Sequence, residues 1–144
     1  MGEWFETGRG VVFPWNCDHF GHMNVRWYAH HFDDAGFHLW TVAGVNHSDL
    51  RAKGMALVVA RTTIDYIHEL VAGELLVIRS GFIRVGNRSL THFARMLNAD
   101  TGTLCATQET TEVFFDPKAR KSAPMPDYIR DKVAARLVSI DDPI

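Results

Sequence analysis

The strongest constraint in the sequence is a change of hydrophobic period after residue 44. Between Val25 and Ala43, apolar or small side chains recur three or four residues apart, which is typical of a helix. Further along, Val, Ile, Thr and aromatic residues dominate, which favours strands. Four such strands are expected, over Leu57–Tyr66, Leu75–Val85, Arg88–Leu97 and Thr103–Phe115.

The remaining segments complete an α+β order. A short strand is expected near Gly10–Phe13, and Asp127–Leu137 has the spacing of a short helix. Loops are expected over Trp15–Asn24 and Val45–Gly54. One strand, one helix and four consecutive strands do not alternate as βαβ units do. An antiparallel sheet curled around the helix is the economical solution.

The helix has clear limits and an unusual surface. Asn24 is a suitable N-cap, and Gly44 is a suitable stop. Trp27, Phe37 and Trp40 add apolar area on a second side. We therefore expect this helix to be buried over much of its circumference.

Composition limits the class of protein. The 144 residues are 47% hydrophobic and carry a formal charge of -2, so we expect one folded domain over 1–144 and no nucleic-acid partner. The core is expected over about 7–117, with a connector and short helix over 118–140. Apolar runs are too short to span a bilayer, so no membrane association is expected. Two cysteines and the lack of a signal pattern favour a cytoplasmic location.

The loop before the helix holds the densest cluster of reactive side chains, Cys17-Asp18-His19-Phe20-Gly21-His22-Met23-Asn24. A carboxylate at Asp18 would lie near unpaired N–H groups at a helix N-terminus. Those groups can stabilise an oxygen that gains charge during acyl transfer. Gly21 would let the backbone turn and a substrate approach closely. This combination suits hydrolysis, although an aspartate before a helix can also be a simple cap.

The pattern Asp18-x-x-Gly21-His22-Met23-Asn24, with Tyr28 on the helix, resembles the signature of the 4-hydroxybenzoyl-CoA thioesterase-like hotdog-fold acyl-CoA thioesterases. Later blocks agree in order and spacing, and the resemblance covers about residues 7–126. They are Thr63-Ile64-Asp65-Tyr66, Ala72-Gly73-Glu74-Leu75, Val85-Gly86-Asn87-Arg88-Ser89-Leu90 and Asp116-Pro117.

The resemblance implies a hotdog fold, in which a five-stranded antiparallel sheet wraps around a long central helix. It also implies a homodimer or a tetramer built as a dimer of dimers, with sites between protomers. Asp18 would be the nucleophile or general base, and backbone N–H groups near Asn24 and Val25 would form the oxyanion site. Some relatives have an aromatic residue or histidine where this chain has Val25, so only a backbone role is expected there.

Other residues are assigned to substrate binding. Gly21, His22 and Tyr28 are expected to contact the substrate, although His22 could equally be a structural loop residue and Tyr28 a core residue. For the CoA phosphates, Arg88 beside the Gly86-Asn87 turn is the preferred cation. Aromatic side chains could also accept an aromatic or quaternary-ammonium acyl group.

No cofactor or metal is expected. His30 and Asp34 have the spacing of two metal ligands on a helix, but no HExxH or CxxC motif accompanies them. Cys17 lacks the partner pattern of a catalytic cysteine.

The leading interpretation is hydrolysis of a short-chain or aromatic acyl-CoA to the free acid and CoA. One alternative is a hotdog 3-hydroxyacyl hydratase or dehydratase, but such enzymes resemble Asp-x-Asn-Pro-x-His, which Asp18 does not begin. The other alternative is a non-catalytic acyl-CoA-binding protein.

Overall fold

The structure is a computed structural model that describes residues 2–143. Its helices and strands follow the order expected from the sequence, with three short elements added. They are β1 (Phe5–Val11), η1 (Pro14–Asn16), α1 (Val25–Val42), α2 (His47–Ala52), β2 (Ala56–Tyr66), β3 (Leu75–Val85), β4 (Ser89–Asn98), β5 (Leu104–Asp116), β6 (Lys121–Ser122) and α3 (Asp127–Ala134).

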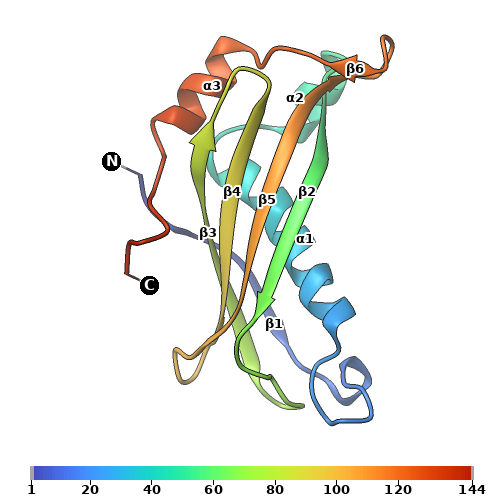
Figure 1. The fold of residues 1–144 in the computed structure, drawn as a ribbon, viewed down its shortest axis with the longest axis vertical. Coiled ribbons are helices and arrows are strands. Elements are labelled where there is room, and N and C mark those ends of the chain that lie inside the picture. The colour runs from blue at the N-terminus through green and yellow to red at the C-terminus, as the bar shows by residue number, and fades with distance from the viewer. Residues whose placement is uncertain (1, 144) are drawn as a thin grey trace.

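One antiparallel sheet forms the body of the molecule. Its strands lie in the order β1-β3-β4-β5-β2, and the short β6 pairs with β5. The register shifts within the β1–β3, β2–β5, β3–β4 and β4–β5 pairs. Such irregularities bend a strand and increase its twist, so the sheet curls around α1, as Figure 1 shows. The expected curled antiparallel sheet is therefore present.

Helix α1 begins and ends where the sequence predicts. Asn24 has extended dihedral angles, and its side-chain oxygen accepts a hydrogen bond from the Arg26 N–H. After the helix, Gly44 adopts a φ of 85°, a left-handed conformation that glycine tolerates best. The 18-residue helix buries one face against the sheet, through Tyr28, Phe32, Ala35, Leu39 and Trp40.

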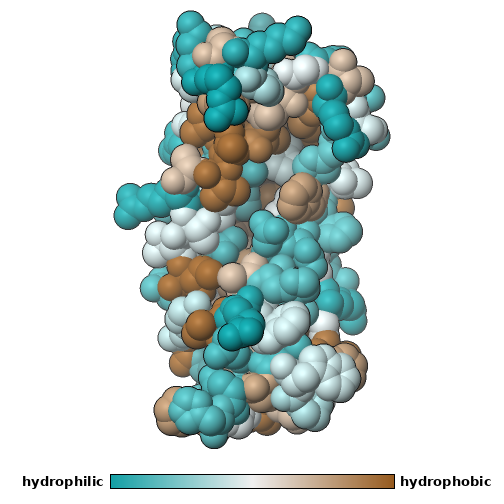
Figure 2. Space-filling view, turned by 90° about the vertical axis from the view of Figure 1, so that its right-hand side faces the viewer, coloured by the Kyte–Doolittle hydropathy of each residue, from teal (hydrophilic) through white to brown (hydrophobic). Residues whose placement is uncertain are grey.

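The expectation that α1 is buried over much of its circumference is wrong for the single chain. Phe37 is 58% exposed, and Val25 and Val42 are also exposed. The sheet covers only the side of α1 that faces it, and the neighbouring edge strand β2 is itself exposed along most of its length. Figure 2 shows hydrophobic patches among hydrophilic side chains on the side of the molecule that carries α1 and β2.

Several expected boundaries were wrong. Strand β1 is longer than predicted and begins at Phe5, and α3 ends at Ala134 rather than at Leu137. The segment predicted as a loop over Val45–Gly54 contains α2, whose first N–H groups are capped by Asn46. Within residues 2–143, none of the helices has the length and apolar character needed to cross a membrane.

Candidate active site

The loop that carries Asp18 is a tight turn held by its own backbone. Cys17 and Met23 form an antiparallel bridge, and the Asp18 N–H donates to the His22 carbonyl over 3.0 Å. The Gly21 N–H donates to the Asp18 carbonyl, also over 3.0 Å. Gly21 has a φ of 80°, so the turn requires the conformation expected of glycine at this position. The loop is therefore fixed before any ligand arrives.

The Asp18 carboxylate accepts two hydrogen bonds inside this turn. One oxygen accepts from the Phe20 N–H at 2.9 Å, and the other accepts from the Asn24 side-chain amide at 3.2 Å. The bond from Phe20 is the main reason that the pKa of Asp18 lies below its usual value, and it outweighs the opposing effect of partial burial. The Asn24 amide lowers the pKa further. Asp18 is therefore a carboxylate at neutral pH.

The start of α1 leaves one N–H group without an acceptor. The Asn24 N–H donates to the Asn16 carbonyl at 2.8 Å, and the N–H groups of Arg26 and Trp27 both donate to Asn24. Within residues 2–143, the Val25 N–H has no hydrogen-bond acceptor. This narrows the predicted oxyanion site, because the amide of Asn24 is already used and the amide of Val25 is free.

The Asp18 loop is joined to the segment that precedes β3. The Met23 N–H donates to the Leu70 carbonyl at 2.7 Å, and His22 forms a bridge with Val71. His22 is exposed, so its side chain can reach a ligand from solvent. Asp18, Gly21, His22, Asn24 and Val25 thus lie together in the loop that leads into α1.

Tyr28 lies in the core. Its side chain packs edge-on against Tyr66 with ring centroids 5.2 Å apart, and the residue is 4% exposed. Burial raises the pKa of Tyr28 to about 12. Of the two interpretations considered, the structure favours core packing over contact with substrate.

Arg88 does not join the other predicted residues. It lies just after the β3–β4 turn, where its guanidinium donates to the Ser122 carbonyl at 2.9 Å. The 11 residues of β3 separate that turn from the Asp18 loop, a distance of roughly 35 Å at about 3.3 Å per residue. Within one chain, Arg88 therefore lies beyond the end of β3 that is far from the Asp18 loop. Consecutive motifs of the family can thus lie at opposite ends of one strand.

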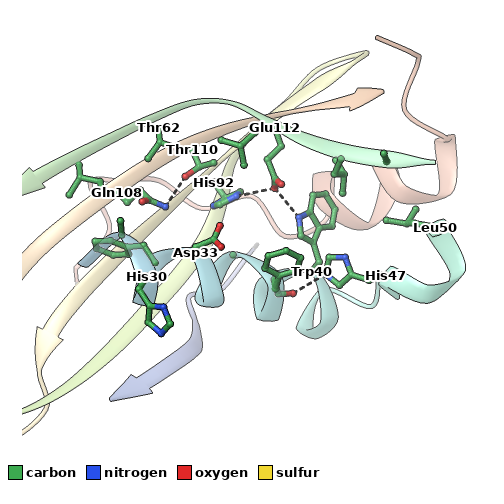
Figure 3. Close-up of a pocket in the computed structure, with 18 of the residues that line it drawn as sticks. His30, Asp33, Trp40, His47, Leu50, Thr62, His92, Gln108, Thr110 and Glu112 are labelled. Atoms are coloured by element: carbon green, nitrogen blue, oxygen red, sulfur yellow. Dashed lines mark hydrogen bonds and ion pairs between the residues drawn. The ribbon is translucent and has the colours of Figure 1, made fainter. Parts of the chain in front are cut away.

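A cavity of about 800 Å³ lies between α1 and the strands β2, β4 and β5. Figure 3 shows side chains from α1, α2 and the strands pointing into it. Its wall is largely apolar but includes several polar groups. The polar and titratable members are His30, Asp33, His47, Arg51, Thr62, His92, Gln108, Thr110 and Glu112.

A buried polar network forms part of this wall. The Trp40 indole N–H donates to Glu112 Oε2 at 2.9 Å, and His92 Nε2 lies 3.0 Å from the same oxygen. Nearby, the Gln108 amide donates to the Thr110 hydroxyl at 2.9 Å. The sequence analysis missed this network because its members come from one helix and two strands. Glu112 is one of several polar residues along this strand, so nothing in the sequence singles it out.

The histidines do not assemble into a metal site. His30 Nε2 lies 3.5 Å from Asp34, and both side chains are more than half exposed. In the described part of the chain, no group of three or more His, Cys, Asp or Glu side chains is arranged to hold a metal ion. Cys17 donates a weak hydrogen bond to the Phe13 carbonyl.

Solved structures share this fold along nearly the whole chain. A hypothetical protein from Staphylococcus aureus, solved in complex with CoA, has a TM-score of 0.87 at 20% identity, covering 99% of this chain and 91% of that one. A predicted thioesterase from Bacillus stearothermophilus has a TM-score of 0.81 at 24% identity, covering 94% and 98%. A 1,4-dihydroxy-2-naphthoyl-CoA thioesterase from Synechocystis has a TM-score of 0.78 at 17% identity, covering 96% and 98%. The fold is the hotdog fold of thioesterases.

Sequence comparison then defines the family. The sequence profile of the Thioesterase-like superfamily matches residues 12–136, so the protein belongs to that family. A curated relative, L-carnitine dehydrogenase/betainyl-CoA thioesterase from Rhizobium meliloti, is 28% identical over 116 residues. That alignment covers 81% of this chain, and the chain spans only 23% of the relative's length.

Proposed function

We propose that the protein hydrolyses an acyl-CoA, with a short-chain or aromatic acyl group, to the free acid and CoA. The observation that carries this proposal is the pairing of an ionised Asp18 with the free Val25 N–H at the start of α1. Membership of a thioesterase family and the betainyl-CoA thioesterase activity of the Rhizobium meliloti relative support the same reaction.

The reaction needs an acceptor for the charge that develops on the thioester oxygen. The Val25 N–H can donate to this oxygen, and the positive end of the α1 dipole favours its negative charge. Because the turn already holds Asp18 by two hydrogen bonds, no rearrangement of the loop is needed. The arrangement therefore stabilises the tetrahedral species more than the neutral substrate.

Asp18 has two possible roles. As a nucleophile, its oxygen attacks the thioester carbon, CoA leaves as the thiolate, and water then hydrolyses the mixed anhydride. As a general base, it removes a proton from a water molecule that attacks the same carbon. A single turnover in H₂¹⁸O that places the label in Asp18 identifies the nucleophile route, with water attacking the Asp18 carbonyl of the anhydride. Label in the product acid alone comes from the general-base route or from attack of water on the acyl carbonyl of the anhydride, and trapping the anhydride with hydroxylamine separates these two.

The test of the proposed function is a turnover screen over acyl-CoAs of different length, charge and aromaticity, with wild type and Asp18→Asn. We expect CoA release by the wild type on at least one substrate and its near-complete loss in Asp18→Asn. The variant should retain the fold, because the asparagine side chain can still accept the Phe20 N–H. Equal turnover by both proteins would refute the role of Asp18.

We further propose that the active protein is a homodimer or a dimer of dimers, with its site shared between copies. Strand β2 is an edge strand of 11 residues, and its exposed surface includes Val59 and Tyr66. An unpaired edge of this kind can pair with the same edge of a second copy. Light scattering coupled to gel filtration tests this, and a monomer that retains full activity would contradict it.

Arg88 lies at the far end of β3 from the Asp18 loop of its own chain, so a cation nearer to that loop is a second candidate for the CoA phosphates. Arg26 is exposed in the first turn of α1, with its Nε 3.2 Å from the Asn24 side-chain oxygen. We propose Arg26 for this role, and expect Arg26→Ala to raise KM for acyl-CoA more than it lowers kcat.

A further inference from the structure

The cavity beside α1 contains a buried carboxylate with one oxygen left open. Both donors to Glu112, from Trp40 and His92, reach the same oxygen, Oε2. In the described part of the chain, no hydrogen bond reaches the other oxygen, Oε1. Within residues 2–143, Trp4 Nε1 is the only side-chain nitrogen or oxygen that is both fully buried and without a partner, so Glu112 Oε1 must be partly accessible. The Glu112 side chain is 12% exposed, and it lines the cavity.

A second carboxylate lines the same cavity. Asp33 is exposed on α1, and in Figure 3 its side chain points from the helix toward the strands that carry His92 and Glu112. The one Lys or Arg side chain among the described lining residues is Arg51, which comes from α2. With the histidines neutral, the lining therefore has a net negative charge. A negative charge in a largely apolar wall favours a cation over a neutral group.

Aromatic surface is available next to these acids. The Phe37 ring is 58% exposed and stacks at a tilt on His47, with centroids 5.3 Å apart. Aromatic faces attract cations, and a quaternary ammonium, which donates no hydrogen bonds, is bound in this way. Neutral apolar acyl groups gain nothing from the carboxylates and must leave Glu112 Oε1 without a partner.

The level of Glu112 along the axis of α1 determines whether a group bound at Glu112 can reach the Asp18 loop of the same chain. A side chain added at Gly36 would lie 3.7 Å from His92, so the network is level with Gly36. At about 1.5 Å per residue, this level lies about 16 Å along the helix from Val25. A compact acyl group held at Glu112 cannot also reach the Asp18 loop of its own chain.

We infer that Glu112 and Asp33 form a subsite for an acyl group that carries a positive charge, preferably a quaternary ammonium, and that this subsite serves the Asp18 loop of a second copy. Trp40 and His92 position Glu112 by holding its other oxygen. This inference rests on the proposed function, because it concerns the substrate of that reaction and the shared site.

The test compares matched acyl-CoAs that differ only in charge. Trimethylammonioacetyl-CoA and 3,3-dimethylbutyryl-CoA are isosteres, as are 4-trimethylammoniobutyryl-CoA and 5,5-dimethylhexanoyl-CoA. We expect the wild type to prefer a charged member by on the order of tenfold in kcat/KM. Glu112→Gln and Asp33→Asn should each reduce that ratio several-fold, mainly by lowering kcat/KM for the charged member.

Asp34→Asn is the matched control, because Asp34 neighbours Asp33 but does not line the cavity. It should leave the charged-to-neutral ratio unchanged. A wild-type ratio of one or less, or a ratio unaffected by both cavity variants, would overturn the inference while leaving thioester hydrolysis intact. Turnover of none of the acyl-CoAs would instead refute the proposed function. Calorimetric binding of the same pairs to Asp18→Asn then tests the charge preference without turnover.

The placement across two copies has its own experiment. Asp18→Asn and Glu112→Gln chains are coexpressed with different tags, and the mixed species is purified through both tags. If the subsite serves the second copy, one of the two sites has both wild-type residues, and about half of the wild-type activity on the charged substrate should return. If no activity above that of the separate variants returns, the subsite does not act across copies.

Discussion

Replacing Val25 by proline removes the proposed oxyanion donor without removing any side chain of the site. The Val25 N–H has no acceptor among the described residues, so the substitution breaks no hydrogen bond of the folded chain. Val25 is the first residue of α1, the helical position at which proline is best tolerated. The preceding Asn24 has φ −70° and ψ 148°, which lies in the region that a following proline favours.

These features let the effect on rate be separated from the effect on folding. Loss of one oxyanion donor lowers kcat by about 10²–10³-fold, or about 2.7–4 kcal/mol of transition-state stabilisation. The Val25 side chain is 56% exposed, so little apolar burial is lost. The free energy of unfolding should therefore change by less than about 1 kcal/mol, with the lower chain entropy of proline acting in the stabilising direction.

The assay is CoA release under saturating acyl-CoA, combined with urea unfolding of the same preparations. Val25→Ala is the control, because it shortens the side chain and keeps the N–H. We expect Val25→Ala to retain a kcat within a few-fold of wild type, and Val25→Pro to lose it. If Val25→Pro is folded and turns over as fast as Val25→Ala, the amide has no role in the reaction.

Four further outcomes follow from the same structure. Asp18→Asn should lower kcat/KM by about 10²–10⁴-fold if Asp18 is the general base, whereas Asp116→Asn, which changes an aspartate with a similar turn geometry, should leave it unchanged. Because the folded protein lowers the pKa of Asp18, its carboxylate form should be fully present above the pKa of the unfolded chain. Activity, and the stability that the hydrogen bonds of Asp18 supply, should be lost only as the pH falls through the lower pKa of the folded state. A pH–rate profile with its acid limb above pH 3.8 would contradict this. Phe32→Ala, at a residue 1% exposed, should cost about 3–5 kcal/mol in urea unfolding, and a loss below about 1 kcal/mol would show that α1 does not depend on this contact. Tyr28→Phe should leave kcat nearly unchanged, because Tyr28 is 4% exposed and packs in the core; a large loss of kcat with an intact fold would restore a role in substrate binding.

Features with a local physical cause could be predicted from the sequence. The start of α1 follows from the capping chemistry of Asn24, and its end follows from the left-handed conformation of Gly44. The four later strands follow from their composition. Helix α2 was missed because its six residues contain no apolar period, although its cap at Asn46 is a visible signal. The fraction of the α1 surface that other elements cover depends on where those elements lie, so it cannot be predicted from the sequence of the helix alone.

The candidate site divides in the same way. Asp18, Gly21 and Asn24 lie within one turn, and their local sequence already specifies the geometry that joins them. The Trp40–Glu112 contact links residues 72 positions apart, and it could be found only from the fold. Arg88 was grouped with the Asp18 loop from the order of the motifs alone. That order does not show near which end of β3 Arg88 lies.

The stiffness of the Asp18 turn has an evolutionary consequence. Its hydrogen bonds join residues 13–24, the first turn of α1 and the Leu70 carbonyl, and none of these residues lines the cavity. Under the two proposals made above, chemistry and recognition are thus encoded by separate parts of the chain. Exchanging a few cavity side chains could redirect such an enzyme to a new metabolite while its reaction centre stays the same.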